Sequence, residues 1–230
     1  IHSIKEPKST TGVLLRLDNL MKKDAEEDMG KLLSYCKETY SAEPKTIIKQ
    51  GYLTDWVEQY GASYEIDLIV MGTNGESNLE ERLFGSVTES VIRTSNIPVF
   101  AIPHTYKATP IRQFILATNK KELAKLDFIQ EFLERLDLEN PSISILTVDT
   151  PDEDESLPKS IPLNGYQIGV QTIKADTAVE GINAYIDQHE VDILALYHSR
   201  NSRLDYFFNR NTTKLICSNT QLPMLVIPLY

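Results

Sequence analysis

Small residues with a distinctive spacing lie between two apolar runs in residues 67–103. The first run, Leu68–Met71, stops at Gly72; Gly75 follows, and Gly85-Ser86 comes after nine intervening residues. Glycines where a strand ends let backbone N–H groups approach a phosphate, and a following helix N-terminus faces that anion with positive partial charge. The pattern differs from a P-loop, which ends in Gly-Lys-Ser/Thr, and from a dinucleotide fingerprint, whose third glycine comes sooner. We therefore expect an anion or nucleotide site here.

A second copy of this segment follows in the chain. A shift of 125 positions places residues 64–103 on 189–228 without a gap, with Asp67 on Asp192 and Thr88 on Thr213. The apolar runs coincide as well. A repeat of this period indicates two copies of one domain, because solenoid repeats are shorter.

The copies differ at the positions of the small residues. The second copy has large side chains there: Tyr197 for Gly72, Arg200 for Gly75, Arg210 for Gly85 and Asn211 for Ser86. Either these are drifting surface loops, or the second copy kept the fold and lost the site. We favour the second interpretation because all four positions changed while the apolar runs remained.

The segments Val70–Thr73, Gly85–Val87 and Ile97–Val99 resemble the nucleotide loop and following strand of universal stress proteins. The whole chain is similar to tandem, two-domain members of that family, and its second half to those of Bacteroidetes-type bacteria. The resemblance implies an α/β fold of two flavodoxin-like, Rossmann-like (adenine nucleotide alpha hydrolase-like) parallel-sheet domains. It also implies strand order 3-2-1-4-5, pairing of dimers through the last strand, and ATP or another adenine nucleotide as ligand.

Carried onto this sequence, the resemblance places a nucleotide beside the first copy's glycines. Met71 and Gly72 would flank it, Gly75 and Gly85 would admit the phosphates, and Ser86 and Val87 would donate to them. For Ser86 the residues alone allow two roles, a ligand hydroxyl or a helix N-cap. The predicted nucleotide-binding residues are Met71, Gly72, Thr73, Gly75, Gly85, Ser86 and Val87. The family's acidic residue at the end of its first strand has no counterpart in the first copy, and the second copy carries Asn119.

Composition excludes several classes of function. The net charge of −10 and the lack of a basic stripe argue against nucleic acid as a partner. The sequence contains no run of 18 apolar residues, so we expect no membrane span. Two cysteines outside any Cys-x-x-Cys pair fit a reducing cytoplasm. The four scattered histidines lack metal-ligand spacing, so we expect no metal site.

Alternating strands and helices predict a first domain at residues 1–107 and a second, degenerate domain at 108–230. The first domain shows no counterpart of the second domain's first strand and helix, so we expect an N-terminally truncated copy. The alternative is a native domain that lacks its first strand, which would remove the central strand of the sheet. The expected helices are 18–40, 53–63, 86–94, 121–136, 177–188 and 211–218. The expected strands are 1–4, 46–49, 67–71, 98–102, 114–118, 143–148, 168–174, 192–197 and 223–227. We expect irregular chain at residues 5–17 and an acidic loop at 149–166.

These patterns lead to a non-enzymatic, adenine-nucleotide-binding stress-response module, forming a homodimer or an internal pseudo-dimer. The alternative is a structural or regulatory interaction protein in which neither copy binds nucleotide. A slow ATPase is a third interpretation. We find no general base beside the loop and no Lys or Arg in it; Glu76, Glu80, Glu81 and Arg82 lie just beyond.

Overall fold

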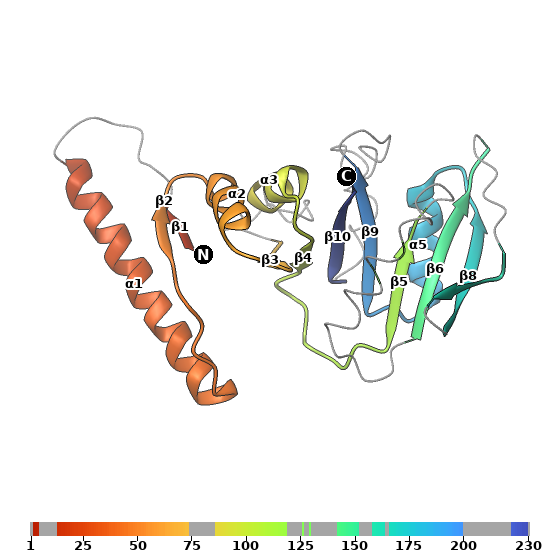
Figure 1. The fold of residues 1–230 in the computed structure, drawn as a ribbon, viewed down its shortest axis with the longest axis horizontal. Helices are drawn as coiled ribbons and strands as arrows, with labels where there is room; N and C mark the ends of the chain where they lie inside the picture. The colour runs from red at the N-terminus through yellow and green to blue at the C-terminus, as the bar shows by residue number, and fades with distance from the viewer. Residues whose placement is uncertain are drawn as a thin grey trace. The chain divides into compact units, whose positions relative to one another are not determined.

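The structure is a computed structural model. It describes residues 2–4, 13–73, 86–118, 126, 129, 142–151, 158–163, 166–199 and 222–229. The chain divides into two compact units, Ile1–Glu65 and Ile66–Tyr230, which are described separately (Figure 1). The predicted domain boundary at residue 107 stays a prediction.

The described part of the first unit contains two short parallel strands and two helices. The elements are β1 (His2–Ile4), α1 (Val13–Tyr40), β2 (Ile48–Gln50) and α2 (Leu53–Ser63). β1 pairs with β2 in parallel, with His2 opposite Ile48. The prediction for α2 is confirmed, whereas α1 begins five residues before the predicted start at Asp18. The apolar spacing used for that prediction starts only at Leu20, and helices commonly extend beyond their periodic stretch.

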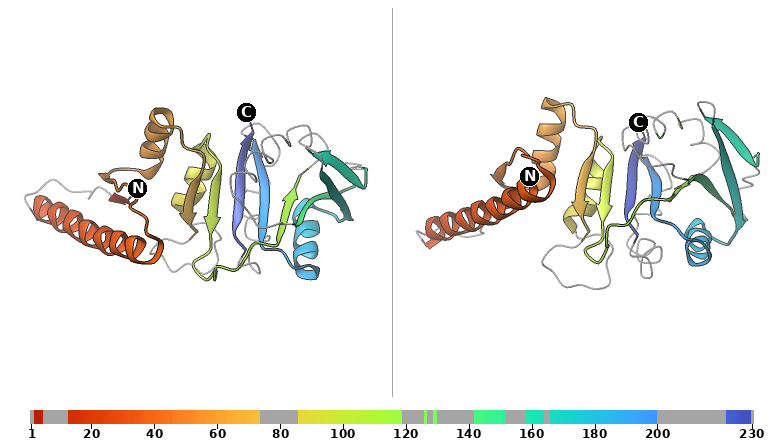
Figure 2. Two further views of the ribbon diagram at one scale, coloured as in Figure 1. Left: turned by 60° about the horizontal axis from the view of Figure 1, so that its bottom comes forward. Right: turned by 90° about the horizontal axis from the view of Figure 1, so that it is seen from below.

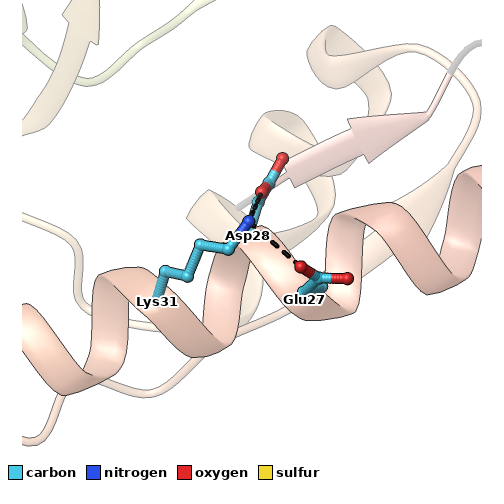
Figure 3. Close-up of polar contacts among 3 residues, drawn as sticks. All are labelled: Glu27, Asp28 and Lys31. Atoms are coloured by element: carbon cyan, nitrogen blue, oxygen red, sulfur yellow. Dashed lines mark hydrogen bonds and ion pairs between the residues drawn. The ribbon is translucent and has the colours of Figure 1, made fainter.

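Oppositely charged residues three and four positions apart line the exposed surface of α1. Lys31 Nζ lies 3.2 Å from Glu27 Oε1 and 3.0 Å from Asp28 Oδ1 (Figure 3). Hydrogen bonds to the Asp28 and Glu27 carboxylates raise the pKa of Lys31 above its ordinary value. These pairs support the helix locally, although exposed ion pairs contribute little to folding.

The second unit is built on one eight-stranded sheet in the order β3-β4-β10-β9-β5-β6-β8-β7. Among its described residues, the helices with defined bounds are α3 (Ser86–Thr94) and α5 (Ala178–Gln188). Its strands are β3 (Ile69–Gly72), β4 (Val99–Ile102), β5 (Gln113–Ala117), β6 (Ser142–Asp149), β7 (Ser160–Leu163), β8 (Tyr166–Lys174), β9 (Ile193–Ser199) and β10 (Met224–Leu229).

Five neighbouring strands of this sheet, β8-β6-β5-β9-β10, are parallel. In chain order they are the third, second, first, fourth and fifth expected strands of the second copy, so the flavodoxin-like order is confirmed. The central strand β5 is buried on both faces, as its apolar run Phe114–Ala117 requires. α5 lies alongside β6 and β8 (Figure 1) and begins after Thr177, whose hydroxyl accepts from Glu180 N at 3.2 Å.

The last strands of the two copies pair with each other. β4 and β10 are antiparallel neighbours, with Phe100 opposite Leu225 (Figure 2). These two residues are repeat counterparts, since they lie 125 positions apart. A strand pair in which a residue faces its own counterpart has a local two-fold axis at that position. The two last strands therefore lie side by side, as expected, whereas the internal pseudo-dimer stays a prediction.

The repeat also holds in hydrogen-bond detail. β3 pairs with β4 and β9 with β10 in parallel and in the same register, 30 positions apart in both pairs. Ile69 N donates to Pro98 O at 2.9 Å, and Leu194 N donates to Pro223 O at 3.2 Å.

One expectation for the second copy is wrong. The acidic stretch 149–166 is not irregular throughout, because β7 occupies Ser160–Leu163 and pairs antiparallel with β8. Pro162 argues against a strand within a sheet, but β7 is an edge strand, where proline is tolerated. The predicted helices at 121–136 and 211–218 lie almost wholly outside the described residues; Leu126 and Ile129 are helical and buried.

Candidate functional site

The described part of the predicted site consists of a strand end and a helix start. Met71 and Gly72 end β3, Thr73 follows, and Ser86 and Val87 begin α3. Gly75 and Gly85 lie outside the described residues.

Two hydrogen bonds hold this strand end in place. Thr88 Oγ1, in the first turn of α3, donates to Gly72 O at 2.8 Å. Thr73 N donates to Ile102 O at 3.0 Å, which extends the β3–β4 ladder by one residue. The first bond brings the end of β3 directly against the start of α3, as the predicted site requires.

Burial separates the framework of this junction from its accessible residues. Thr73 and Thr88 are each 3% exposed, so their side chains belong to the framework. Ser86 and Val87 are exposed. At Gly72 an added Cβ would meet no atom within 4 Å. The accessible surface is therefore formed by Gly72 and the first turn of α3.

The electrostatics of the junction come from α3. The first N–H groups of a helix have no partners within the helix, and they carry the positive end of its dipole. The first turn also contains Glu89, whose Oε1 lies 4.0 Å from Arg93 Nη1. An anion at Ser86 and Val87 would thus meet unpaired helix N–H groups, with the Glu89 charge partly offset by Arg93.

Among the described residues, the second copy has a large buried side chain at the counterpart of Gly72. Tyr197, the counterpart of Gly72, is 2% exposed and lies in a core cluster with Phe114, Leu116 and Ile227. The other changed positions, Arg200, Arg210 and Asn211, lie outside the described residues. Where Gly72 leaves open space in the first copy, the Tyr197 side chain of the second copy packs in the apolar core.

Sequence reasoning missed Thr88 as a residue of the junction. Its signal was present, because Thr88 recurs as Thr213 in the repeat. Its acceptor is a backbone carbonyl 16 residues away, which no side-chain pattern indicates.

The described residues contain neither a candidate metal site nor a membrane-spanning helix. No group of three or more His, Cys, Asp or Glu side chains there could hold a metal ion. Within the same residues, no helix has both the length and the apolar composition that crossing a membrane requires.

Residues 5–103 match the Universal stress protein family. The matched range includes both halves of the β3–α3 junction and all predicted nucleotide-binding residues. The first half of the chain is thus similar to a universal stress protein domain. The tandem arrangement and the Bacteroidetes-like origin stay predictions.

Two curated universal stress proteins of Methanocaldococcus jannaschii are similar to parts of this chain. Universal stress protein MJ0577 is 41% identical over 58 residues, which is 25% of this chain and 36% of that protein. Universal stress protein MJ0531 is 30% identical over 86 residues, which is 37% of this chain and 50% of that protein. The chain spans half the length or less of these relatives.

The fold is shared over a longer range. The crystal structure of a universal stress protein from Archaeoglobus fulgidus aligns with a TM-score of 0.66. The alignment covers 99% of this chain and 86% of that one at 16% identity. At this identity the likeness shows the α/β fold alone.

Proposed function

We propose that this chain is a non-enzymatic stress-response protein of the cytoplasm that binds ATP or another adenine nucleotide. The nucleotide site is in the first copy only, at Met71–Thr73, Gly75 and Gly85–Val87. The observation that carries the proposal is the β3–α3 junction, where Thr88 holds the end of β3 against a helix N-terminus and Gly72 leaves open space. Helix N-termini preceded by glycine-containing loops bind phosphate through backbone N–H groups. The family match over residues 5–103 supports the same assignment.

The experiment measures nucleotide on the purified protein. Denaturation should release material that absorbs at the adenine wavelength and that mass spectrometry identifies as an adenine nucleotide. Gly85→Arg should abolish it by filling the phosphate space, as Arg210 is expected to do in the second copy. Gly30→Arg is the matched control, because Gly30 lies on α1 with nothing within 4 Å of an added Cβ.

The alternative is an interaction protein with neither site loaded. The buried Tyr197 supports it for the second copy, because the opening there is filled. If no nucleotide is released and none binds in a calorimetric titration, the alternative replaces the proposal. Nucleotide that survives Gly85→Arg unchanged would contradict the assignment of the site.

We further propose that the two copies form an internal pseudo-dimer through β4 and β10. The antiparallel register that places Phe100 opposite Leu225 supports this arrangement. Sedimentation should then give a monomer, whereas a homodimer of this chain would indicate another interface.

A further inference from the structure

Aromatic side chains recur at every fourth position along α2 and its two cap residues. Positions four apart lie on one face of a helix and are displaced by about 6 Å along its axis. The outer two residues are strongly exposed, Tyr52 at 78% and Tyr64 at 62%, and the inner two are partly buried. The rings of Tyr60 and Tyr64 stack with their centroids 5.7 Å apart. We call these residues the aromatic stripe: Tyr52, Trp56, Tyr60 and Tyr64.

The fold of α2 does not require an aromatic ring at its first cap. Tyr52 is the N-cap residue and makes no side-chain capping bond, whereas serine, threonine, aspartate and asparagine are preferred there. The helix α5, whose bounds lie 125 positions after those of α2, shows the usual arrangement. Its N-cap Thr177 accepts a hydrogen bond from Glu180 N at 3.2 Å. Gly181 of α5 occupies the position of Trp56. Tyr52 and Trp56 are thus features of the first copy that helix formation does not explain.

The ring of Trp56 already contacts one cation of the same unit. Lys49 Nζ, on β2, lies 5.1 Å from the centroid of the Trp56 ring, which is within the range of a cation–π contact. The indole N–H of Trp56 donates to Gln50 O at 3.0 Å, so the ring is held against the end of β2. This contact shows the kind of group that the aromatic stripe accepts.

The charged side chains along α2 are all acidic. Residues 52–65 contain Asp55, Glu58 and Glu65, all exposed, and no lysine or arginine. Guanidinium groups stack on aromatic faces and also pair with carboxylates. Carboxylates repel the phosphates of nucleic acid, whose binding depends on lysine and arginine. The charge of this surface is therefore complementary to a segment that contains arginine.

We propose that the aromatic stripe is the docking surface for an extended, arginine-containing segment of another protein. In an extended chain, alternate side chains project to the same side about 6–7 Å apart, close to the spacing of the rings along α2. Arginines at alternate positions can therefore stack on successive rings, while the carboxylates of α2 supply the complementary charge. Tyrosine, tryptophan and arginine are also the residues enriched at the energetic centres of protein interfaces. This inference goes beyond nucleotide binding and does not depend on it.

A labelled peptide, Arg-Gly-Arg-Gly-Arg-Gly-Arg, tests this proposal. Its binding to the 230-residue protein is followed by fluorescence anisotropy. Trp56 is the only tryptophan of the chain, so a change in its emission shows that the peptide reaches the stripe. A peptide of the same composition with its four arginines in one block should bind more weakly, because consecutive side chains of an extended segment point to opposite sides. Equal binding of the two peptides would show that net charge alone attracts them and would overturn the proposal.

A substitution at the N-cap removes one ring of the stripe without weakening the helix. Tyr52→Ser supplies a preferred N-cap residue, so the protein should stay folded while the Kd of the peptide rises about two- to fivefold. Tyr40→Ser is the matched control, because it removes another exposed ring of the same unit, at the C-terminal end of α1. The control should leave the Kd unchanged.

The substitution of Lys49 should have the opposite effect. Lys49→Ala uncovers the face of Trp56 and should lower the Kd about two- to fivefold. Lys45→Ala removes an exposed lysine and controls for the loss of one positive charge, so its effect should be smaller. If the two lysine variants change the Kd equally and Tyr52→Ser does not change it, the stripe is not the docking surface. Binding of single-stranded RNA in place of the peptide would also overturn the proposal.

Discussion

Thr88 is the residue that connects the strand and the helix of the candidate site. Its hydroxyl donates to Gly72 O while the side chain is 3% exposed, so no water can replace it easily. Thr88→Val keeps the shape and removes the donor. We expect a loss of about 1–2 kcal/mol in the free energy of unfolding, measured by urea denaturation. Thr88→Ser keeps the hydroxyl and should retain the bond, so an equal loss in the free energy of unfolding in both variants would argue against this role.

Tyr185 provides a prediction on alkaline pH. Its ring is 4% exposed and stacks on His189 at 4.0 Å between centroids. Burial raises the pKa of Tyr185 above its ordinary value of 10.0, while a hydrogen bond with Gln171 acts in the opposite direction. The folded state thus favours the neutral phenol. This contribution to stability is complete below pH 10 and is lost as pH rises through the higher folded pKa.

Tyr185→Phe removes the ionisable group and should flatten this part of the stability profile. Thermal unfolding of both proteins between pH 8 and pH 11 measures it. Parallel decline of the two melting temperatures above pH 10 would show that other groups cause the loss.

At the residue scale, the spacing of the glycines was a better guide to the location of the candidate site than to the role of each residue in it. The glycine pattern led to Gly72, and the structure shows open space there. It gave no indication that Thr73 is buried, because burial depends on the neighbouring strand β4. Tyr197 was expected to fill a ligand space, and its place in the apolar core is a consequence of strand alternation on β9.

At the scale of elements, strong local signals gave accurate bounds. α2 and α3 begin and end at the predicted residues, because glycine and small residues delimit a clear apolar period. Most strand bounds differ by one or two residues, since pairing partners decide where a ladder ends. β7 was not predicted because Pro162 argues against a strand. Proline is tolerated in an edge strand, but the sequence of this segment does not show that β7 lies at the edge of the sheet.

Two helical glycines should respond in opposite directions to the same substitution. On α1, an alanine Cβ at Gly30 meets nothing within 4 Å, so Gly30→Ala should stabilise the protein by about 0.5–1 kcal/mol through helix propensity. On α5, the Cβ at Gly181 would lie 2.5 Å from Val148 Cγ1 of β6. Gly181→Ala should therefore destabilise by about 1–3 kcal/mol. Chemical denaturation measures both, and Gly181→Ala with Val148→Ala should recover part of the loss.

At the scale of the whole molecule, the repeat predicted the sheet of the second copy and the meeting of β4 with β10. It could not show that β1 and β2 form a sheet of their own, because that depends on which strands are present to pair. The predicted nucleotide site depends on the same question. Ligands of open α/β sheets bind where neighbouring strands end, so a second neighbour of β3 would be part of the site. Among the described residues β3 pairs with β4 alone.

A graft tests this dependence. Residues 108–141, placed ahead of Ile1 through a flexible linker, supply a strand and the following sequence of the second copy. If the added strand docks on β3, ATP affinity measured by calorimetry should rise about tenfold, because the site is then preorganised. A graft with lysines at the positions of Ile115 and Leu116 is the control. Equal affinity in graft, control and parent would show that the strand is not part of the nucleotide site.

The pairing of β4 with β10, in which repeat counterparts lie opposite each other, also affects which substitutions the two halves of the chain can accept. In a homodimer of identical subunits, every substitution appears twice, once on each side of the axis. Here the residues on the two sides are encoded separately, so Phe100 can face Leu225 instead of another phenylalanine. Two repeat copies within one chain can thus differ at single positions while their last strands stay paired. The filled Tyr197 and the open Gly72 are the two outcomes of that freedom within one molecule.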